Sequence, residues 1–233
     1  IRFIIVSSLS VMVFLNIFRS RYGNAASFVN VLLLAFFVLP GSSMAVDTVR
    51  ILALGDSLSS GHGLMRADSF PSQLERALVN KGILTKVTNA GVSGDTSAGG
   101  LSRLDWALSE GFDGVIIELG ANDGLRGLEP SETLKNLDAI LAKLQLNELS
   151  VLLTGMQAPP NLGVEYAKEF AAIFPHLATK YDIVFYPFFL EGVAAIVDLN
   201  QEDTIHPNSE GVGVIVKNIF PYVIEMIKAV KSQ

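Results

Sequence analysis

The chain has 233 residues, of which 50% are hydrophobic and 17% are charged, and a length of this size suits one domain with a removable segment better than two independent cores. Its formal net charge of -6 argues against a nucleic-acid partner, because binding to the phosphate backbone needs a basic patch. The absence of cysteine excludes disulfides, thiolate metal sites and a cysteine nucleophile.

The first segment, residues 1–45, is expected to be an apolar export signal. Two apolar runs flank the basic stretch Arg19-Ser20-Arg21, and the second of them extends from Phe28 to Leu39. Pro40-Gly41 ends this run, and Ser43-Met44-Ala45 offers small residues for cleavage. We therefore expect cleavage near Ala45 and a periplasmic or secreted protein. The alternative is an uncleaved membrane anchor facing the periplasm, although both runs are shorter than a full membrane span.

The rest of the chain, residues 46–233, is expected to form one α/β domain. Apolar, β-rich runs alternate with amphipathic segments, which is typical of a parallel sheet covered by helices on both faces. The predicted strands are Val49–Leu54, Leu84–Asn89, Gly114–Leu119, Val151–Thr154 and Ile183–Tyr186. The predicted helices span residues 69–81, 97–110, 131–146, 162–180 and 209–230. These elements predict a three-layer α/β/α sandwich with a five-stranded parallel sheet of the flavodoxin-like kind. In such sheets ligands bind beyond the carboxyl ends of the strands.

A serine follows the first predicted strand directly. Gly55-Asp56-Ser57-Leu58 places Ser57 in the turn from strand to helix, where glycine permits a tight bend and the hydroxyl can be exposed. The alternative interpretation is a serine that only caps the following helix. The position of Ser57 at a strand end favours a nucleophile.

A serine nucleophile needs a base, and the chain offers three histidines. His62 lies in a Gly-flanked loop and His176 lies in a predicted helix, so we expect neither to take part. His206 belongs to the stretch Asp203-Thr204-Ile205-His206-Pro207, just before the last predicted helix. Asp203 can reach the ring of His206 and fix its tautomer, as in a Ser-His-Asp arrangement. The alternatives for this pair, helix capping or metal ligation, lack a further His/Asp cluster beside it. We therefore predict Ser57, Asp203 and His206 as the catalytic residues, without a metal or another cofactor.

Two further loops offer donors for the oxyanion of a tetrahedral intermediate. The loop after the second predicted strand contains Gly94, whose backbone N–H is not blocked by a side chain. The loop after the third contains Asn122, whose amide can donate directly. Taken singly, both loops have ordinary turn composition. Together with Ser57 they fill three successive strand ends.

These motifs, in this order, resemble those of the GDSL (SGNH) hydrolases. Over roughly residues 49–230 the chain is similar to the bacterial thioesterase I/lysophospholipase group, which includes arylesterase-like enzymes. The stretches that carry this closer similarity are Ser93–Ser97, Gly120–Gly127 and Pro187–Leu190. The resemblance implies that Ser57, Gly94, Asn122 and His206 are the signature residues, that Asp203 orients His206, and that the backbone N–H of Ser57 joins Gly94 and Asn122 in the oxyanion hole. His62 departs from the family, which commonly has an aromatic residue there.

The resemblance also implies a broad carboxylic ester hydrolase, active on acyl thioesters, lysophospholipids and aryl or short-chain esters. An exported enzyme would rarely meet acyl-CoA, so we expect oxoesters as biological substrates, with transient contact to a membrane or lipid allowed and no obligate protein partner. Apolar residues near the strand ends are candidates for an acyl groove, although ordinary core packing is the alternative for each. These candidates are Leu125, Leu128, Met156 and Leu162, with Phe188 and Phe189 after the fifth strand.

Two other functions remain open from the sequence. A carbohydrate O-deacetylase with the same machinery would need aromatic sugar platforms near the site, and the only tryptophan, Trp106, lies in a predicted helix. A non-catalytic binding module would leave the complete set of catalytic motifs without a purpose.

Overall fold

The computed structural model of the chain describes residues 48–230. The predicted export segment and its cleavage site lie outside the described residues. Within the described part, no helix combines the length and the apolar character that a membrane span requires.

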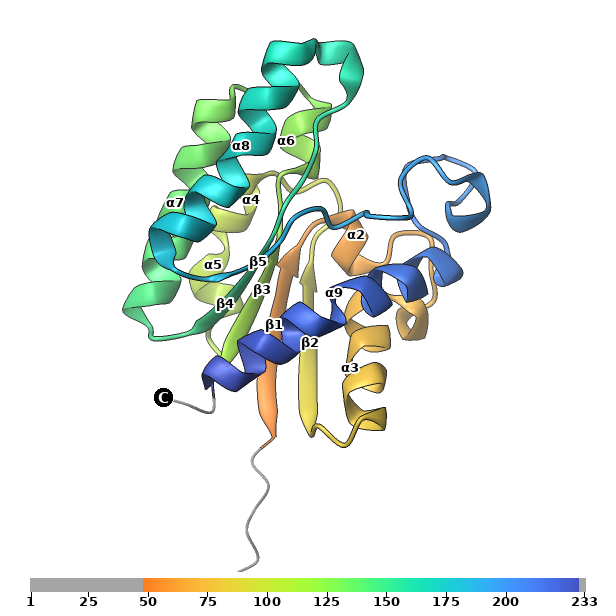
Figure 1. Cartoon of the computed structure of the whole chain (residues 1–233). Coiled ribbons are helices and arrows are strands. Elements are labelled where there is room, and N and C mark those ends of the chain that lie inside the picture. The colour runs from red at the N-terminus through yellow and green to blue at the C-terminus, as the bar shows by residue number, and fades with distance from the viewer. Residues whose placement is uncertain (1–47, 231–233) are drawn as a thin grey trace, which may run out of the picture. The chain divides into compact units, whose positions relative to one another are not determined.

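Five parallel strands form one sheet in the order β2-β1-β3-β4-β5, which Figure 1 shows at the centre of the domain. The strands are β1 (Val49–Gly55), β2 (Thr85–Gly91), β3 (Gly114–Glu118), β4 (Ser150–Thr154) and β5 (Val184–Tyr186). All five predicted strands are present, with ends shifted by one or two residues. The chain passes from β1 to β2 and then returns to place β3 on the other side of β1. This reversal opens a crevice at the carboxyl ends of β1 and β3, the position where such folds bind ligands.

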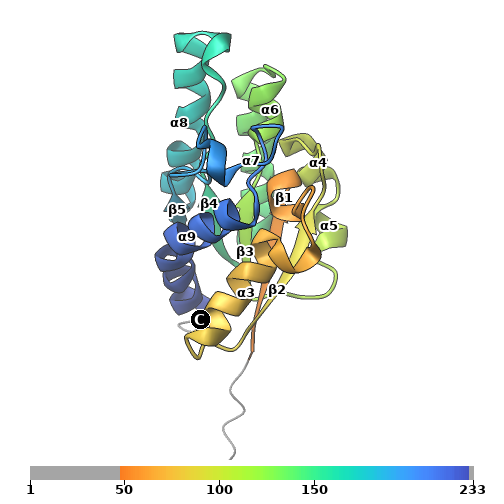
Figure 2. The ribbon, with the colours of Figure 1, turned by 90° about the vertical axis from the view of Figure 1, so that its right-hand side faces the viewer.

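Helices cover both faces of the sheet, so the predicted three-layer α/β/α sandwich is confirmed. The helices of the described part are α2 (Ser57–Ser60), α3 (Phe70–Asn80), α4 (Ser97–Ser102), α5 (Leu104–Ala107), α6 (Ala121–Leu125), α7 (Pro130–Leu146), α8 (Val164–Tyr181) and α9 (Ser209–Val230). Helices α3 and α9 pack together on one face, and in Figure 2 they lie in front of the sheet. Helix α7 packs between α4 and α8 on the other face.

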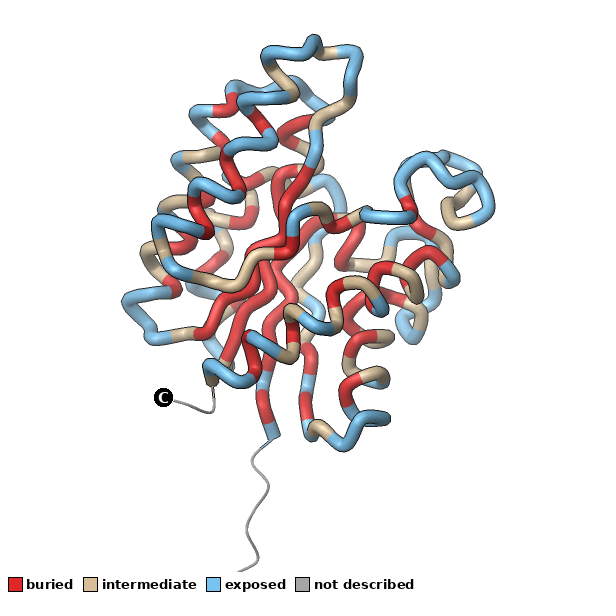
Figure 3. The backbone as a smooth tube through the Cα atoms, in the orientation of Figure 1, coloured by how far each residue is buried: buried red, intermediate tan, exposed pale blue. Residues whose placement is uncertain are grey.

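The core lies between these layers. The strands β3 and β4 are buried along their whole length, which Figure 3 shows as a continuous buried band through the domain. Helix α7 contributes the apolar face that its sequence predicted, with Leu137, Ile140, Leu141 and Leu144 buried and Leu134 half-buried. This face packs α7 into the core on one side of the sheet.

The segment predicted as one helix over 97–110 is divided at Arg103 into α4 and α5. Arg103 forms an ion pair with Asp95 over 2.6 Å, and its Nη2 donates to the carbonyl of Gly55 at 2.9 Å. Gly100 in α4 lies so close to β3 that a Cβ there would approach Leu119 to 2.3 Å. These contacts fix the loop after β2 against the end of β1. The segment therefore forms two short helices instead of one continuous helix.

Candidate active site

Ser57 is the first residue of α2, immediately beyond the carboxyl end of β1. Asp56 caps this short helix, because its Oδ1 accepts a hydrogen bond from the N–H of Leu58 at 2.9 Å. Gly55 is required at the bend, since a Cβ there would lie 2.2 Å from Oγ of Ser59. The turn therefore holds Ser57 at the mouth of the crevice between β1 and β3.

His206 and Asp203 lie beside Ser57, in the loop between β5 and α9. The Nε2 atom of His206 is 2.9 Å from Oγ of Ser57, and its Nδ1 atom is 2.6 Å from Oδ2 of Asp203. The backbone of the loop shares in this arrangement, because Gln201 N donates to the carbonyl of His206 and Thr204 has a positive φ of 63°. The structure thus brings together the three residues predicted to be catalytic.

Asp203 is fixed by hydrogen bonds and keeps its charge. Its Oδ1 accepts from the backbone N–H of His206 at 2.9 Å and from that of Ile205 at 3.0 Å. The His206 N–H, the His206 ring and the Ile205 N–H hold the pKa of this carboxyl well below its usual range. An ionised Asp203 is the partner that a protonated imidazole needs.

The two predicted oxyanion loops reach the same place. Gly94 has a positive φ of 85°, which a side chain would strain, and its carbonyl accepts from Nη2 of Arg126 at 2.8 Å. Within the described residues neither the N–H of Gly94 nor that of Ser57 has a hydrogen-bond acceptor. Both backbone donors are therefore open to a substrate oxygen.

The amide of Asn122 is already engaged on both of its hydrogens. Nδ2 donates to Oδ2 of Asp56 at 3.0 Å and to the backbone carbonyl of Asp95 at 2.9 Å. This arrangement places the amide between the ends of β1 and β2. To serve an oxyanion, Asn122 has to share or exchange one of these two bonds.

A cavity of about 500 Å³ opens beside Ser57 and His206. Of the apolar residues predicted to bind substrate, Leu125, Met156 and Phe188 line it. The remaining lining includes residues that the sequence did not single out: Leu58, Ala121, Ala158, Pro159, Pro160, Leu190, Ala194 and Ile205.

Three of the other apolar candidates lie outside this lining. Leu128 is 39% exposed on the surface, and Leu162 contacts Gly127 from the 3₁₀ turn Pro160–Leu162. Phe189 is fully buried and packs edge-on against Phe70, with ring centroids 5.0 Å apart. An apolar pattern alone does not reveal which residues of a loop line a cavity and which, like Phe189, pack into the core. Trp106 is also outside the cavity and is 75% exposed on α5.

His62 lies in the site although we expected no part for it. Its ring packs against that of His206, with centroids 4.6 Å apart, and its carbonyl accepts from Nε2 of Gln201 at 2.7 Å. His176 is exposed on α8, away from the site, in line with its interpretation from sequence. The glycines on either side of His62 indicated a bend, but no local signal indicated which ring it would meet.

A buried aspartate, Asp123, ties the two oxyanion loops together. It accepts hydrogen bonds from the backbone N–H and the hydroxyl of Ser97, and from Oγ1 of Thr133 at 3.1 Å. These bonds connect the start of α4, the helix α6 and the start of α7. Asp123 follows Asn122 directly, so the network restrains the backbone that carries the amide.

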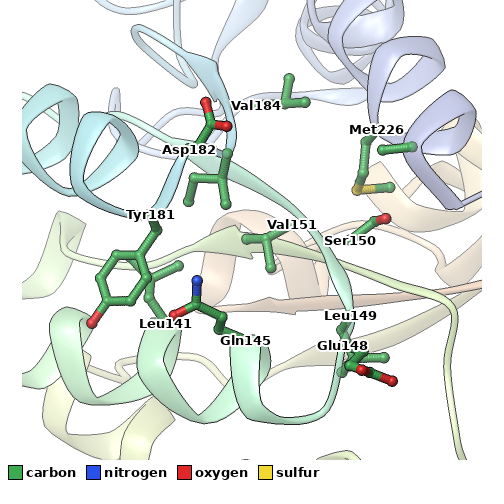
Figure 4. A pocket seen from close by; sticks show the side chains of 12 residues that line it. Leu141, Gln145, Glu148, Leu149, Ser150, Val151, Tyr181, Asp182, Val184 and Met226 are labelled. Carbon is green, nitrogen blue, oxygen red and sulfur yellow. The ribbon is translucent and has the colours of Figure 1, made fainter. Parts of the chain in front are cut away.

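A second cavity, of about 530 Å³, lies at the amino ends of β4 and β5 and is shown in Figure 4. Leu141, Val151 and Met226 contribute apolar walls, and none of the predicted site residues lines it. Residues 48–230 contain no cluster of three or more His, Asp or Glu side chains placed to hold a metal ion.

Comparison with known proteins places the chain among ester hydrolases. Residues 53–214 match the GDSL-like lipase/acylhydrolase family. The chain is 39% identical to the esterase TesA of Pseudomonas aeruginosa over 73% of its own length and 86% of that protein. It is 40% identical to the thioesterase 1/protease 1/lysophospholipase L1 of Escherichia coli, over 71% of its own length and 78% of that protein. The crystal structure of AlinE4, an SGNH-hydrolase family esterase, is 47% identical and superposes with a TM-score of 0.66 over 77% of this chain and 96% of that one.

Proposed function

Because the chain belongs to the GDSL-like lipase/acylhydrolase family, we propose that it hydrolyses carboxylic esters and thioesters through an acyl-enzyme intermediate on Ser57. The chain is a hydrolase, and its relatives carry the names of an esterase and of a thioesterase/lysophospholipase. The observation that carries the mechanism is the pair of contacts made by His206, at 2.9 Å to Ser57 and at 2.6 Å to Asp203.

In the first half of the proposed reaction, Oγ of Ser57 attacks the carbonyl carbon while Nε2 of His206 takes the hydroxyl proton. The carbonyl electron pair moves onto oxygen and forms a tetrahedral intermediate. When this intermediate collapses, the bond to the alcohol or thiol breaks, and His206 returns the proton to that leaving group. In the second half a water molecule repeats the sequence, and the carboxylic acid leaves Ser57 free again.

The negative oxygen of the intermediate requires hydrogen-bond donors. We assign this role to the backbone N–H groups of Ser57 and Gly94 and to the amide of Asn122. The two backbone donors have no acceptor within the described residues, and their positions on short, fixed turns keep them ready for the substrate. Preorganised donors of this kind stabilise the transition state more than water does, because they need not reorient.

The cavity indicates the acyl part of the substrate. Leu125, Met156 and Phe188 give it an apolar wall that suits an acyl chain or an aryl group. Among the described residues no Lys or Arg lines it, so a negatively charged acyl end would find no lysine or arginine to pair with there. We therefore assign neutral acyl and aryl esters, thioesters and lysophospholipids as the substrate class.

The place of action follows from the first 45 residues rather than from the described structure. The basic stretch, the apolar run and the small residues before Val46 support export and cleavage near Ala45. We propose that the enzyme acts in the periplasm or outside the cell, on small-molecule esters. Amino-terminal sequencing of protein from a periplasmic extract tests this: a start at or near Val46 supports it, and recovery only in membranes with the segment intact supports an anchor.

The proposed activity is tested with p-nitrophenyl esters and an acyl thioester. The wild-type protein should hydrolyse both, and Ser57→Ala and His206→Ala should each abolish turnover while leaving the circular dichroism spectrum unchanged. Activity in Ser57→Ala close to that of the wild-type protein would contradict the mechanism.

A further inference from the structure

Two carboxyl groups lie buried beneath Ser57, and the proposed mechanism uses neither of them. Asp56 and Glu118 are both fully buried, one at the end of β1 and the other at the end of β3. The register of the sheet pairs Glu118 with Gly55, so the glutamate lies directly under the turn. A Cβ at Gly55 would come within 2.5 Å of Oε2 of Glu118, so this proximity depends on the glycine.

Glu118 holds the turn on both sides of the nucleophile. Its Oε2 accepts from the N–H of Asp56 at 3.2 Å, from the N–H of Ser59 at 3.1 Å and from Oγ of Ser59 at 2.7 Å. Its Oε1 has no hydrogen-bond partner, and no Lys or Arg forms an ion pair with it within the described residues. Burial and the neighbouring Asp56 raise the pKa of Glu118 well above its ordinary value. Burial without a cationic partner therefore favours the protonated form of Glu118, and Oε1 is the oxygen that no donor occupies.

Asp56 has the opposite surroundings, because both of its oxygens accept hydrogen bonds from N–H groups. Oδ1 accepts from Leu58 N at 2.9 Å, and Oδ2 accepts from Nδ2 of Asn122 at 3.0 Å. Burial raises its pKa to about 6, while these two donors oppose that rise. Asp56 is therefore the member of the pair whose hydrogen-bond partners favour the ionised form.

The charged groups around Asp56 come from three other elements. Glu118 faces it from β3, His206 from the loop before α9, and Asp95 from the loop before α4. Asp95 is held in turn by its ion pair with Arg103. Asp56 thus lies where the nucleophile turn, the general base and the Asp95 loop meet.

We propose that Asp56 is a positioning residue that orients the Asn122 amide for the oxyanion, and that Glu118, as an uncharged acceptor, fixes the turn on which Asp56 and Ser57 stand. This inference rests on the proposed function. Asp56 retains one N–H of the amide and so fixes its plane. The other N–H, which points to the carbonyl of Asp95 in the structure, is the one that the substrate oxyanion recruits in place of that carbonyl.

The test is a double-mutant cycle with Asp56→Asn and Asn122→Ala. Asparagine caps a helix as well as aspartate does, so Asp56→Asn keeps the bond from Leu58 but sets an NH₂ group against the NH₂ group of Asn122. Since the amide is then turned away, kcat should fall by about 10²-fold, the size expected for the loss of one oxyanion donor, with KM nearly unchanged. The double variant should be no slower than Asn122→Ala alone, because both changes remove the same donor. Asp56→Ser, which keeps a capping oxygen but cannot reach Asn122, should behave in the same way.

Glu118→Gln is the matched control. Its side-chain oxygen can accept the same three hydrogen bonds, and it carries no charge, so kcat should stay close to that of the wild-type enzyme. If Glu118→Gln lost as much activity as Asp56→Asn, the charge would reside on Glu118 and the assignment would be overturned. The assignment would also be overturned if the fold-losses in kcat of the two single variants multiplied in the double variant Asp56→Asn/Asn122→Ala. A wild-type kcat in Asp56→Asn would overturn it as well.

These outcomes are separable from failure of the proposed function. Full activity in Ser57→Ala would contradict the proposed acyl-enzyme mechanism itself. A slow Asn122→Ala variant together with a fully active Asp56→Asn variant leaves the mechanism intact and removes only the role of Asp56.

Discussion

Nε2 of His206 lies 2.9 Å from Oγ of Ser57, although 149 positions of sequence separate the two residues. The contact exists because β1 and the loop before α9 both end at the carboxyl edge of the sheet. It needs the loop 203–206 to hold its shape, and Asp203 provides this by accepting two backbone N–H groups as well as the ring.

Replacing Asp203 should therefore change the orientation of the His206 ring and remove the negative charge that faces it. In Asp203→Asn the amide NH₂ can face Nδ1 of His206 and favour the wrong tautomer, so kcat should fall by about 10²- to 10⁴-fold. The measurement is the pH profile of kcat for p-nitrophenyl butyrate in both proteins. A kcat equal to that of the wild-type enzyme across the profile would remove Asp203 from the mechanism.

His62 offers a test of ring packing against the imidazole of His206. Its ring lies 4.6 Å from that of His206, and an aromatic pair of this kind contributes about 0.5–1.5 kcal/mol. His62→Ala should lower kcat by about two- to tenfold, because the imidazole loses one side of its support, whereas His62→Phe should keep the ring contact and most of the activity. If His62→Ala and His62→Phe had the same kcat as the wild-type enzyme, the ring contact would have no effect on catalysis.

The apolar wall of the cavity predicts how activity depends on acyl chain length. Each methylene group that the wall covers should add up to about 0.8 kcal/mol of binding, so kcat/KM should rise from acetyl toward medium chains and then level. Leu125→Ala should flatten this rise and leave acetyl ester turnover nearly intact, since Leu125 lines the cavity and forms no hydrogen bond to Ser57, Asp203 or His206.

Leu162→Ala is the control for chain length. Leu162 lies outside the cavity lining and packs against Gly127, so its loss should leave the chain-length profile unchanged. A flattened profile in Leu162→Ala with a normal one in Leu125→Ala would place the acyl chain against Leu162 instead of Leu125.

The buried acid Glu118 predicts a pH dependence of stability. Its pKa is raised in the folded protein above the ordinary value of 4.5, so the folded state retains the proton of Glu118 to a higher pH than the unfolded chain does. The stability linked to this proton is complete below pH 4.5 and is lost as the pH rises. Glu118→Gln removes this loss, so the melting temperature of the variant relative to wild type should increase from pH 5 to pH 8. A constant difference would show that Glu118 is ionised in the folded protein.

Much of the fold could be predicted because its signals are local. Alternation of apolar strands and amphipathic helices specified the sheet, and the leucine spacing of α7 identified its buried face. The short helix α6 escaped prediction because Gly120-Ala-Asn-Asp has turn composition and only packing extends it into a helix. Arg103, at the break, contacts Asp95 and Gly55, which lie outside that segment, 8 and 48 positions away in the sequence.

In the site, too, residues that belong to sequence motifs could be predicted, whereas contacts between loops could not. Motif order identified Ser57, Gly94, Asn122, Asp203 and His206, which the structure brings to one edge of the sheet. The contact of His62 with His206 and the position of Leu162 outside the cavity depend on loop conformations, which residue types do not encode. Glu118 could have been noticed, since a carboxylate at the end of the buried run Gly114–Glu118 is costly and needs a reason.

The central claim is that Ser57 is activated by His206, and the most direct measurement is covalent labelling with a fluorophosphonate followed by mass spectrometry of the tryptic peptides. The account predicts a single adduct on Ser57 in the wild-type protein, no adduct in Ser57→Ala and greatly slowed labelling in His206→Ala. An adduct on another residue, or labelling of Ser57 at an unchanged rate in His206→Ala, would contradict it.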